Sequence, residues 1–386
     1  MASIDPSKKL ICQLVIGKVN PADPQLQPAT WENLFPLANR EGLAPLLYWR
    51  LQSTGWPAAL PRTVRQSLAE VYYGSVAHNA LLFSELDKIL PLLQRENIPA
   101  LLVKGASLAL DFYPEQGLRP MVDVDCLVPR DFYRHAARLL RGLGYLPGNH
   151  DQVPGMHEMS DYHTGLKGGP GNRVIFELHW GLVSTPLAWY AAPVRWFWEH
   201  NEPWGGDGVT RQLTPLAHLV YLSGHTMLQH GGSQLLLIWL YDIHLLVESG
   251  RIDWNELVES VAGFHWGGVV AKALRWAQAA FDTNLPAGVL ERLDQVSEPA
   301  VDQLVAFKQR FRGSRLMYDW YSLIALRGIS RLRYALSMIF PQPAYIRWRY
   351  NPKPAWLWPV YYPYRWLRML IEGIQAVHNG ILRAVR

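Results

Sequence analysis

The segment that most constrains the fold is Leu101–Val128, which reads LLVKGASLALDFYPEQGLRPMVDVDCLV. Its pattern predicts a short apolar strand, a glycine turn, a short helix, a loop and a second strand. Because alternate residues of a strand point to one face, the Asp-Val-Asp sequence directs Asp123 and Asp125 to the same side. Two like charges this close are unfavourable unless a cation lies between them, and carboxylate oxygens are ligands that suit Mg²⁺.

Candidate phosphate-binding residues lie around the glycine turn. Gly105 begins the predicted helix, whose free N–H groups favour a phosphate. Lys104 ends the first strand and Arg119 precedes the second, so both can neutralise charge in phosphoryl transfer. Either cation can equally be a structural partner of an aspartate, and the Ser107 hydroxyl can bind phosphate or cap the helix. The segment therefore predicts metal-assisted chemistry on a nucleotide.

A third carboxylate is expected from a predicted hairpin, in which HTGLK and RVIFELHW are joined by GGPGN. In the second arm Glu177 and His179 share a face, opposite Phe176 and Leu178. An acid within an apolar strand is unfavourable unless it is paired or bound to metal, so Glu177 is the expected third ligand and an arginine partner is the alternative. Three carboxylates around two metal ions can activate a hydroxyl and stabilise a leaving pyrophosphate. His179 is expected to orient the substrate or act as a base.

Changes of sequence period divide the chain into four regions. Residues 1–96 have helical spacing, and residues 97–205 alternate between strand and helix patterns. Helical patterns return in residues 206–344. The stretch DWNELVESVAGFHWGGVVAKALRWAQAAFD is predicted to be a single helical pattern. Residues 345–386 form a basic, aromatic tail, and the prolines of residues 345–366 exclude a regular helix throughout that stretch. The expected fold class is therefore α+β, with a small sheet core flanked by helical regions.

Charge is distributed unevenly along the chain. Residues 308–386 contain 14 Lys and Arg but 2 acids, for a net charge of +12, whereas the whole chain carries +5. This asymmetry indicates an anionic partner for the basic segment, either nucleic acid or a lipid surface, and a solvated helical face is the alternative. The interleaved aromatic residues of the tail suit single-stranded nucleic acid, a membrane interface or simple packing on the fold.

The cysteines and the distribution of apolar residues bear on where in the cell the protein is located. Cys12 and Cys126 have no metal-binding or redox spacing. No apolar segment follows the first residue and no run of 18 apolar residues occurs, so neither a signal peptide nor a transmembrane segment is expected. The predicted location is cytoplasmic.

The later histidines are given a structural interpretation. His225 and Asp242 lie on consecutive predicted helices and are expected to form a buried hydrogen-bonded pair. A zinc site is less favoured, because His225 and His230 are five residues apart and fit poorly on one helical face.

Several spaced motifs follow one order: a Lys-Gly turn, a Tyr-Pro loop, an arginine, Asp-x-Asp followed by Leu-Val, and a later Glu-x-His-Trp. This order resembles an uncharacterised bacterial nucleotidyltransferase family within the DNA-polymerase-β-like superfamily, over nearly the whole chain. The matching residues are Lys104, Gly105, Tyr113, Arg119, Asp123, Asp125, Leu127, Val128, Glu177, His179, Trp180, His225, Trp239 and Asp242.

The resemblance implies a mixed-sheet nucleotidyltransferase core with helical additions. It also implies Mg²⁺-dependent transfer of a nucleoside monophosphate from an NTP to an acceptor hydroxyl. By that analogy Asp123 and Asp125 bind both metal ions and Glu177 binds the catalytic one, with Mn²⁺ as an alternative metal. These three residues are the expected catalytic and metal-binding set, and Lys104, Gly105, Ser107, Arg119 and His179 are the expected nucleotide-binding set.

One departure from the superfamily pattern concerns the triphosphate. The usual Gly-Ser turn is Gly-Ala-Ser here, and a longer segment separates Ser107 from Asp123. Triphosphate binding is therefore expected to depend on Lys104 and Arg119 more than on Ser107. Membership of a superfamily does not name the acceptor, which can be an RNA end or a peptide, protein or sugar. The alternative function is a non-catalytic NTP- or nucleic-acid-binding protein that retains the fold.

Overall fold

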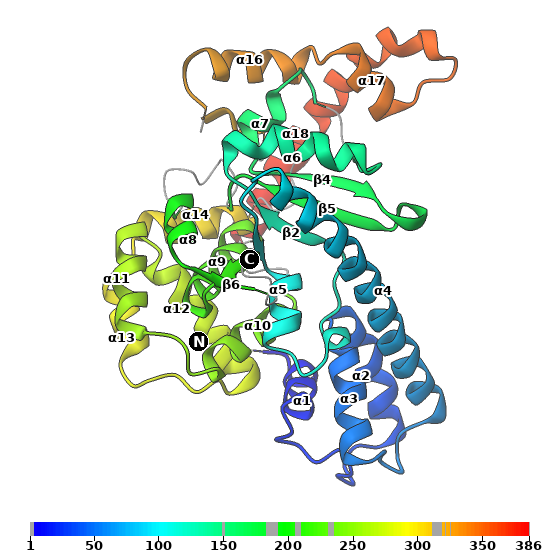
Figure 1. Ribbon diagram of the computed structural model, residues 1–386, viewed down its shortest axis with the longest axis vertical. Coiled ribbons are helices and arrows are strands. Elements are labelled where there is room, and N and C mark those ends of the chain that lie inside the picture. The colour runs from blue at the N-terminus through cyan, green and yellow to red at the C-terminus, as the bar shows by residue number, and fades with distance from the viewer. Residues whose placement is uncertain are drawn as a thin grey trace.

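The computed structural model is an α+β protein in which helices surround a seven-stranded mixed sheet, which confirms the expected fold class (Figure 1). The structure describes residues 4–148, 151–182, 192–204, 210–230, 235–310, 319–320, 322–324 and 326–385.

The sheet has the strand order β3-β4-β5-β2-β1-β7-β6. Strand β2 is antiparallel to β1 and parallel to β5, and β1 is parallel to β7. In this register Asp125 lies opposite Glu177 on β5 and opposite Val103 on β1, so β2 holds the centre of the sheet. The strands are β1 Leu101–Val103, β2 Val124–Leu127, β3 Leu146–Pro147, β4 His163–Gly168, β5 Val174–His179, β6 Asn201–Pro203 and β7 Arg211–Leu213.

The two strands of the Asp-Val-Asp segment and the β4–β5 hairpin are confirmed, whereas β3, β6 and β7 were not predicted. Each of these three has only two or three residues, which is too short for a recognisable period. Because β7 pairs directly with β1, the sheet includes residues on both sides of the boundary predicted at 205. The four-region division itself stays a prediction.

The N-terminal helices are α1 Pro6–Val15, α2 Pro28–Arg40, α3 Ala44–Thr54 and α4 Arg62–Arg95. Helix α4 is continuous, with Pro91 inside it, and it joins two hydrophobic cores. Val64 and Leu68 of its first half pack in the helical core, whereas Leu86 and Leu93 of its second half pack against the sheet. Figure 1 shows α4 running from the small N-terminal helices up to β5.

Short helices connect the strands, and α6 covers the sheet. The buried side chains of Tyr133, Ala136 and Leu140 recur along one side of α6, and Gly144 follows it with a φ of 87°. One face of α6 is therefore buried, and a glycine in the left-handed conformation follows the helix. The elements are α5 Gly105–Asp111, η1 Gln116–Leu118, α6 Arg130–Gly142, α7 Met156–Ser160, η2 Pro170–Asn172 and α8 Val194–Glu199.

The later helices pack into the helical core, and one prediction for them is wrong. The segment predicted as one helical pattern after Asp253 is two helices, because His265 adopts the left-handed conformation and turns the chain there. The burial of Trp266 just after the turn stabilises this change of direction. The elements are α9 Pro215–Gly224, the π-helical turn η4 His225–Gln229, α10 Leu237–Glu248, α11 Trp254–Phe264, α12 Gly267–Phe281, α13 Val289–Gln295 and α14 Pro299–Arg310.

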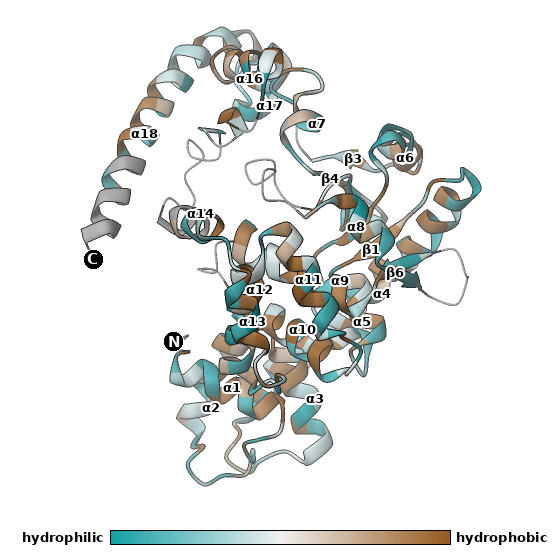
Figure 2. Cartoon of the chain, turned by 90° about the vertical axis from the view of Figure 1, so that its left-hand side faces the viewer, coloured by the Kyte–Doolittle hydropathy of each residue, from teal (hydrophilic) through white to brown (hydrophobic). Residues whose placement is uncertain are grey.

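The C-terminal part is made of separate helices, so the prediction that residues 345–366 are not one regular helix is confirmed. Figure 2 shows α18 running along the edge of the molecule. Among the helices that the structure describes, none is long and apolar enough to cross a membrane. The elements are α16 Gly328–Ile339, α17 Pro343–Tyr350, η5 Ala355–Val360 and α18 Tyr361–Val385.

Candidate active site

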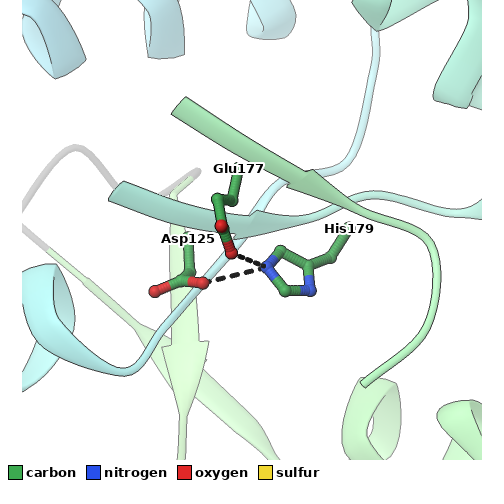
Figure 3. Close-up of side chains that lie close together, drawn as sticks. All are labelled: Asp125, Glu177 and His179. Atoms are coloured by element: carbon green, nitrogen blue, oxygen red, sulfur yellow. Dashed lines mark hydrogen bonds and ion pairs between the residues drawn. The ribbon is translucent and has the colours of Figure 1, made fainter. Parts of the chain in front are cut away.

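Three predicted site residues converge on the adjacent strands β2 and β5. One donor atom from each of Asp125, Glu177 and His179 lies within 4.8 Å of the other two (Figure 3). His179 Nε2 is 2.9 Å from Asp125 Oδ1 and 3.3 Å from Glu177 Oε2. Asp125 and His179 are buried and Glu177 is half-buried, so the site opens on the side of Glu177.

The His179 ring is surrounded by acceptors. Its Nε2 faces the two carboxylates, and its Nδ1 lies 3.3 Å from the carbonyl oxygen of Gly181. A neutral imidazole has one N–H, so it can donate at one of these two positions only. The arrangement is satisfied by an imidazolium, or by a cation that binds Nε2 and the carboxylates together. Although burial lowers the pKa of His179, the hydrogen bonds to Asp125 and Glu177 raise it above the usual value.

His163 of β4 completes the surroundings of Glu177, and this residue was not predicted to belong to the site. It lies opposite His179 in the β4–β5 register, and the two rings stack with centroids 4.9 Å apart. His163 Nε2 is 3.6 Å from Glu177 Oε1. Burial favours a high pKa for Glu177, but the hydrogen bonds from both histidines and the nearby Lys104 charge hold that pKa well below its usual value. The predicted hairpin placed His163 in its first arm, but no register was predicted for it.

Lys104 brings a buried positive charge to the carboxylates. Its Nζ lies 2.7 Å from Asp125 Oδ1 and 5.9 Å from the centre of the Tyr221 ring. Burial opposes the charge, but Asp125 outweighs it and raises the pKa of Lys104 well above its usual value. The backbone of Lys104 has a φ of 55° and a ψ of −128°, a conformation that costs a non-glycine residue about 1–3 kcal/mol. Strain of this kind is typical of functional sites.

Asp123 lies just before β2 rather than within it, and it is half-buried. Burial and the negative charges of Asp125 and Glu177 raise the pKa of Asp123 to about 7. Burial is the larger cause, and the two neighbouring carboxylates add to it. A bound cation would relieve that repulsion.

The structure gives Arg119 and Ser107 buried partners. Arg119 donates to both carboxylate oxygens of Asp242, from Nε at 2.9 Å and from Nη2 at 2.8 Å, and Tyr113 donates to Asp242 Oδ1 at 2.6 Å. Ser107 donates its hydroxyl to Gln212 of β7 at 2.6 Å and does not cap α5. Arg119 Nη1 still faces Gly105, whereas the Ser107 hydroxyl is engaged by Gln212.

The expected hydrogen bond between His225 and Asp242 is wrong, because Arg119 and Tyr113 occupy Asp242. His225 instead contacts Gln229 within the π-helical turn, with Nδ1 2.5 Å from Oε1. Burial, and then the charge of Lys104, lower the pKa of His225 well below its usual value. The chain order of the two helices predicted their proximity, but it did not predict the competing arginine from the α5–β2 loop.

The Gly105→Ala substitution is expected to destabilise the protein by about 1–3 kcal/mol. A Cβ at Gly105 would lie 2.5 Å from Arg119 Nη1 and 3.1 Å from Met121 Sδ. Arg119 cannot move away freely because Asp242 holds it at two positions. The change in the free energy of unfolding is measured by urea titration.

The Gly142→Ala variant is the matched control, because a Cβ there meets nothing within 4 Å at the end of α6. It should be neutral or slightly stabilising, since alanine favours the helix. Equal effects of the two substitutions would contradict the close contact between Gly105 and Arg119.

A mixed sheet with two carboxylates and an imidazole on adjacent strands, next to a buried lysine, is the kind of arrangement that phosphoryl-type group transfer uses. Residues 27–282 match the family described as uncharacterised nucleotidyltransferase, and the chain belongs to that family. The matched region runs from α2 to α12 and contains every predicted site residue. Neither a curated protein nor a solved structure matches the chain.

Proposed function

We propose that the protein transfers a nucleoside monophosphate from an NTP to an acceptor hydroxyl, with divalent metal held by Asp125, Glu177, His179 and Asp123. The observation that carries this proposal is the convergence of carboxylate and imidazole donor atoms within 4.8 Å in a protein of this family. Carboxylate oxygens suit Mg²⁺, and the imidazole ligand makes Mn²⁺ a good alternative. When bound, the metal lowers the pKa of the acceptor hydroxyl and neutralises charge on the leaving pyrophosphate.

The chain's own residues have separate roles in this proposal. Asp125 and Glu177 provide the negative charge, and His179 holds both carboxylates in place or joins them as a ligand. Lys104 and Arg119 supply positive charge to the phosphates. Because α5 has only seven residues, its first amides contribute less than these cations, although Gly105 allows the phosphates to approach the backbone closely.

The acceptor is proposed to be an RNA end, or a peptide, protein or sugar. NTPs and such acceptors meet in the cytoplasm, which is the proposed location. The alternative, a non-catalytic nucleotide-binding protein, predicts NTP binding without transfer. The charge arrangement favours catalysis, because two clustered carboxylates with Asp123 nearby repel one another at a cost that a binding protein need not bear.

The decisive experiment incubates the purified protein with Mg²⁺ and each α-labelled NTP, in separate reactions with total RNA, extract protein and small metabolites. Label should accumulate in one pool, and chelation of the metal should prevent it. The Glu177→Gln variant should lose transfer while it keeps its circular dichroism spectrum. NTP binding by calorimetry without label in any pool would support the binding protein instead.

A further inference from the structure

The C-terminal helices are joined to one another by their own contacts. Arg365 Nε of α18 donates to the carbonyl oxygen of Met338 at 3.0 Å, and Trp366 Nε1 donates to that of Ile339 at 2.8 Å. The rings of Phe340 and Trp366 also meet edge to face, with centroids 5.6 Å apart. The first turns of α18 are therefore held against the end of α16.

One side of α16 attaches this unit to the rest of the protein. Arg333 donates to the carbonyl oxygen of Pro154 at 2.8 Å, and the backbone N–H of Gln342 donates to that of Gln152 at 2.7 Å. Tyr334, in the same part of α16, is buried against the segment before β4. The opposite side of α16 therefore faces away from the rest of the protein.

The outward sides of α16 and α18 carry large apolar side chains at helical spacing, three and four residues apart, so each set forms a stripe on one face. Their exposed fractions range from 44% to 76%. The Phe340–Trp366 contact brings the end of the α16 stripe near the start of the α18 stripe, and Figure 2 shows hydrophobic residues recurring along α18. The stripe residues are Ile329, Leu332, Leu336, Ile339, Leu367, Leu370, Ile371 and Ile374.

The charge around these stripes is strongly positive. Residues 328–385, which include α16, α17 and α18, contain eight Lys and Arg but one acid, for a net charge of +7. That acid, Glu372, already accepts a hydrogen bond from Arg368 at 2.7 Å. The segment also lies beyond residue 282, where the match to the nucleotidyltransferase family ends.

The apolar stripes and the positive charge together favour one kind of binding partner over others. A second copy of the chain would bring another segment of net charge +7 against the first, which is repulsive. RNA stacks its bases on aromatic rings and gains little from aliphatic stripes. An anionic phospholipid surface accepts both features, because apolar side chains and tryptophan enter the interface while Arg and Lys remain at the headgroups.

We propose that α16–α18 binds flat on an anionic phospholipid surface through the two apolar stripes and their surrounding arginines. None of the described helices is suited to crossing a bilayer, so the protein lies on the membrane rather than through it. This inference does not depend on the proposed nucleotidyl transfer, because the stripes contain no residue of the carboxylate site.

The test is flotation of the full-length protein with vesicles of phosphatidylcholine alone or mixed with phosphatidylglycerol. The wild type should float with the mixed vesicles only, and less so as salt is raised. The double variant Leu367→Glu, Ile374→Glu should partition at least about tenfold less, because two apolar side chains leave the interface and two negative charges enter it. The matched control is Leu146→Glu, an equally exposed leucine of β3 outside the stripes, which should float like the wild type.

Other outcomes would overturn the proposal. Absence of flotation, or equal flotation of wild type and double variant, would exclude a lipid surface held by these stripes. A dimer in sedimentation equilibrium that the double variant abolishes would show that a second copy covers them. Salt-sensitive RNA binding without flotation would assign the segment to nucleic acid. Circular dichroism of each variant checks that the fold is kept.

Discussion

The Asp125→Asn variant is expected to lose nucleotidyl transfer by about 10²–10³-fold or more, the loss typical for a group that acts on transition-state charge. Asp125 is the centre of the site, because it is 2.7 Å from Lys104 Nζ and 2.9 Å from His179 Nε2 and lies opposite Glu177. Asparagine keeps the shape of the side chain but removes its negative charge. Within the cluster, Glu177 would then be the one carboxylate left to balance the charge of Lys104 and to face His179.

The measurement compares initial transfer rates with α-labelled NTP, and Mn²⁺ binding followed by electron paramagnetic resonance supplies a second readout. Both should fall together if Asp125 is a ligand. The control is Asp282→Asn, a carboxylate at the end of α12 that binds Lys9 and Lys18 outside the site. It should leave transfer unchanged. Wild-type transfer by Asp125→Asn would contradict the proposed site.

The Asp242→Ala variant is expected to destabilise the protein by about 3–5 kcal/mol, the cost of leaving a buried charge without its partner. Asp242 is fully buried and accepts two hydrogen bonds from Arg119 and one from Tyr113. Burial alone disfavours the charged guanidinium, but Asp242 reverses this and raises the pKa of Arg119. The charge therefore persists when its partner is removed, and the folded state bears the cost.

Urea unfolding measures this loss, and two further variants test its cause. Tyr113→Phe removes a single hydrogen bond and should cost about 1 kcal/mol. The double variant Arg119→Met, Asp242→Leu should recover much of the stability, because no charge then stays buried. If Asp242→Ala unfolds at the wild-type urea concentration, the ion pair has no structural role.

The convergence of Asp125 and Glu177 could be predicted because both lie on strands with clear alternation. The two-residue repeat of a strand determines which face a side chain occupies. In the structure the two residues lie opposite each other on neighbouring strands. The same rule was less informative for Asp123, since β2 begins only at Val124. The tight cluster accordingly holds His179 in place of Asp123.

The fate of Arg119 and Ser107 could not be predicted, because both are determined by residues far along the chain. Arg119 and Asp242 are 123 positions apart, and Ser107 and Gln212 are 105 apart. Gln212 belongs to β7, a three-residue strand whose existence depends on the free edge of β1 rather than on its own sequence. Local patterns identify side chains with reactive chemistry, whereas competition for their hydrogen bonds is settled only by tertiary packing.

The Arg119–Asp242 pair has a consequence for folding during synthesis. A ribosome has made Lys104, Asp125 and Glu177 well before it makes β7 and α10. Until α10 leaves the exit tunnel, Arg119 lacks its hydrogen-bonded partner Asp242, and the loop before β2 lacks this anchor. The nascent chain can therefore anchor the loop that leads into Asp123 and Asp125 only after α10 has left the exit tunnel.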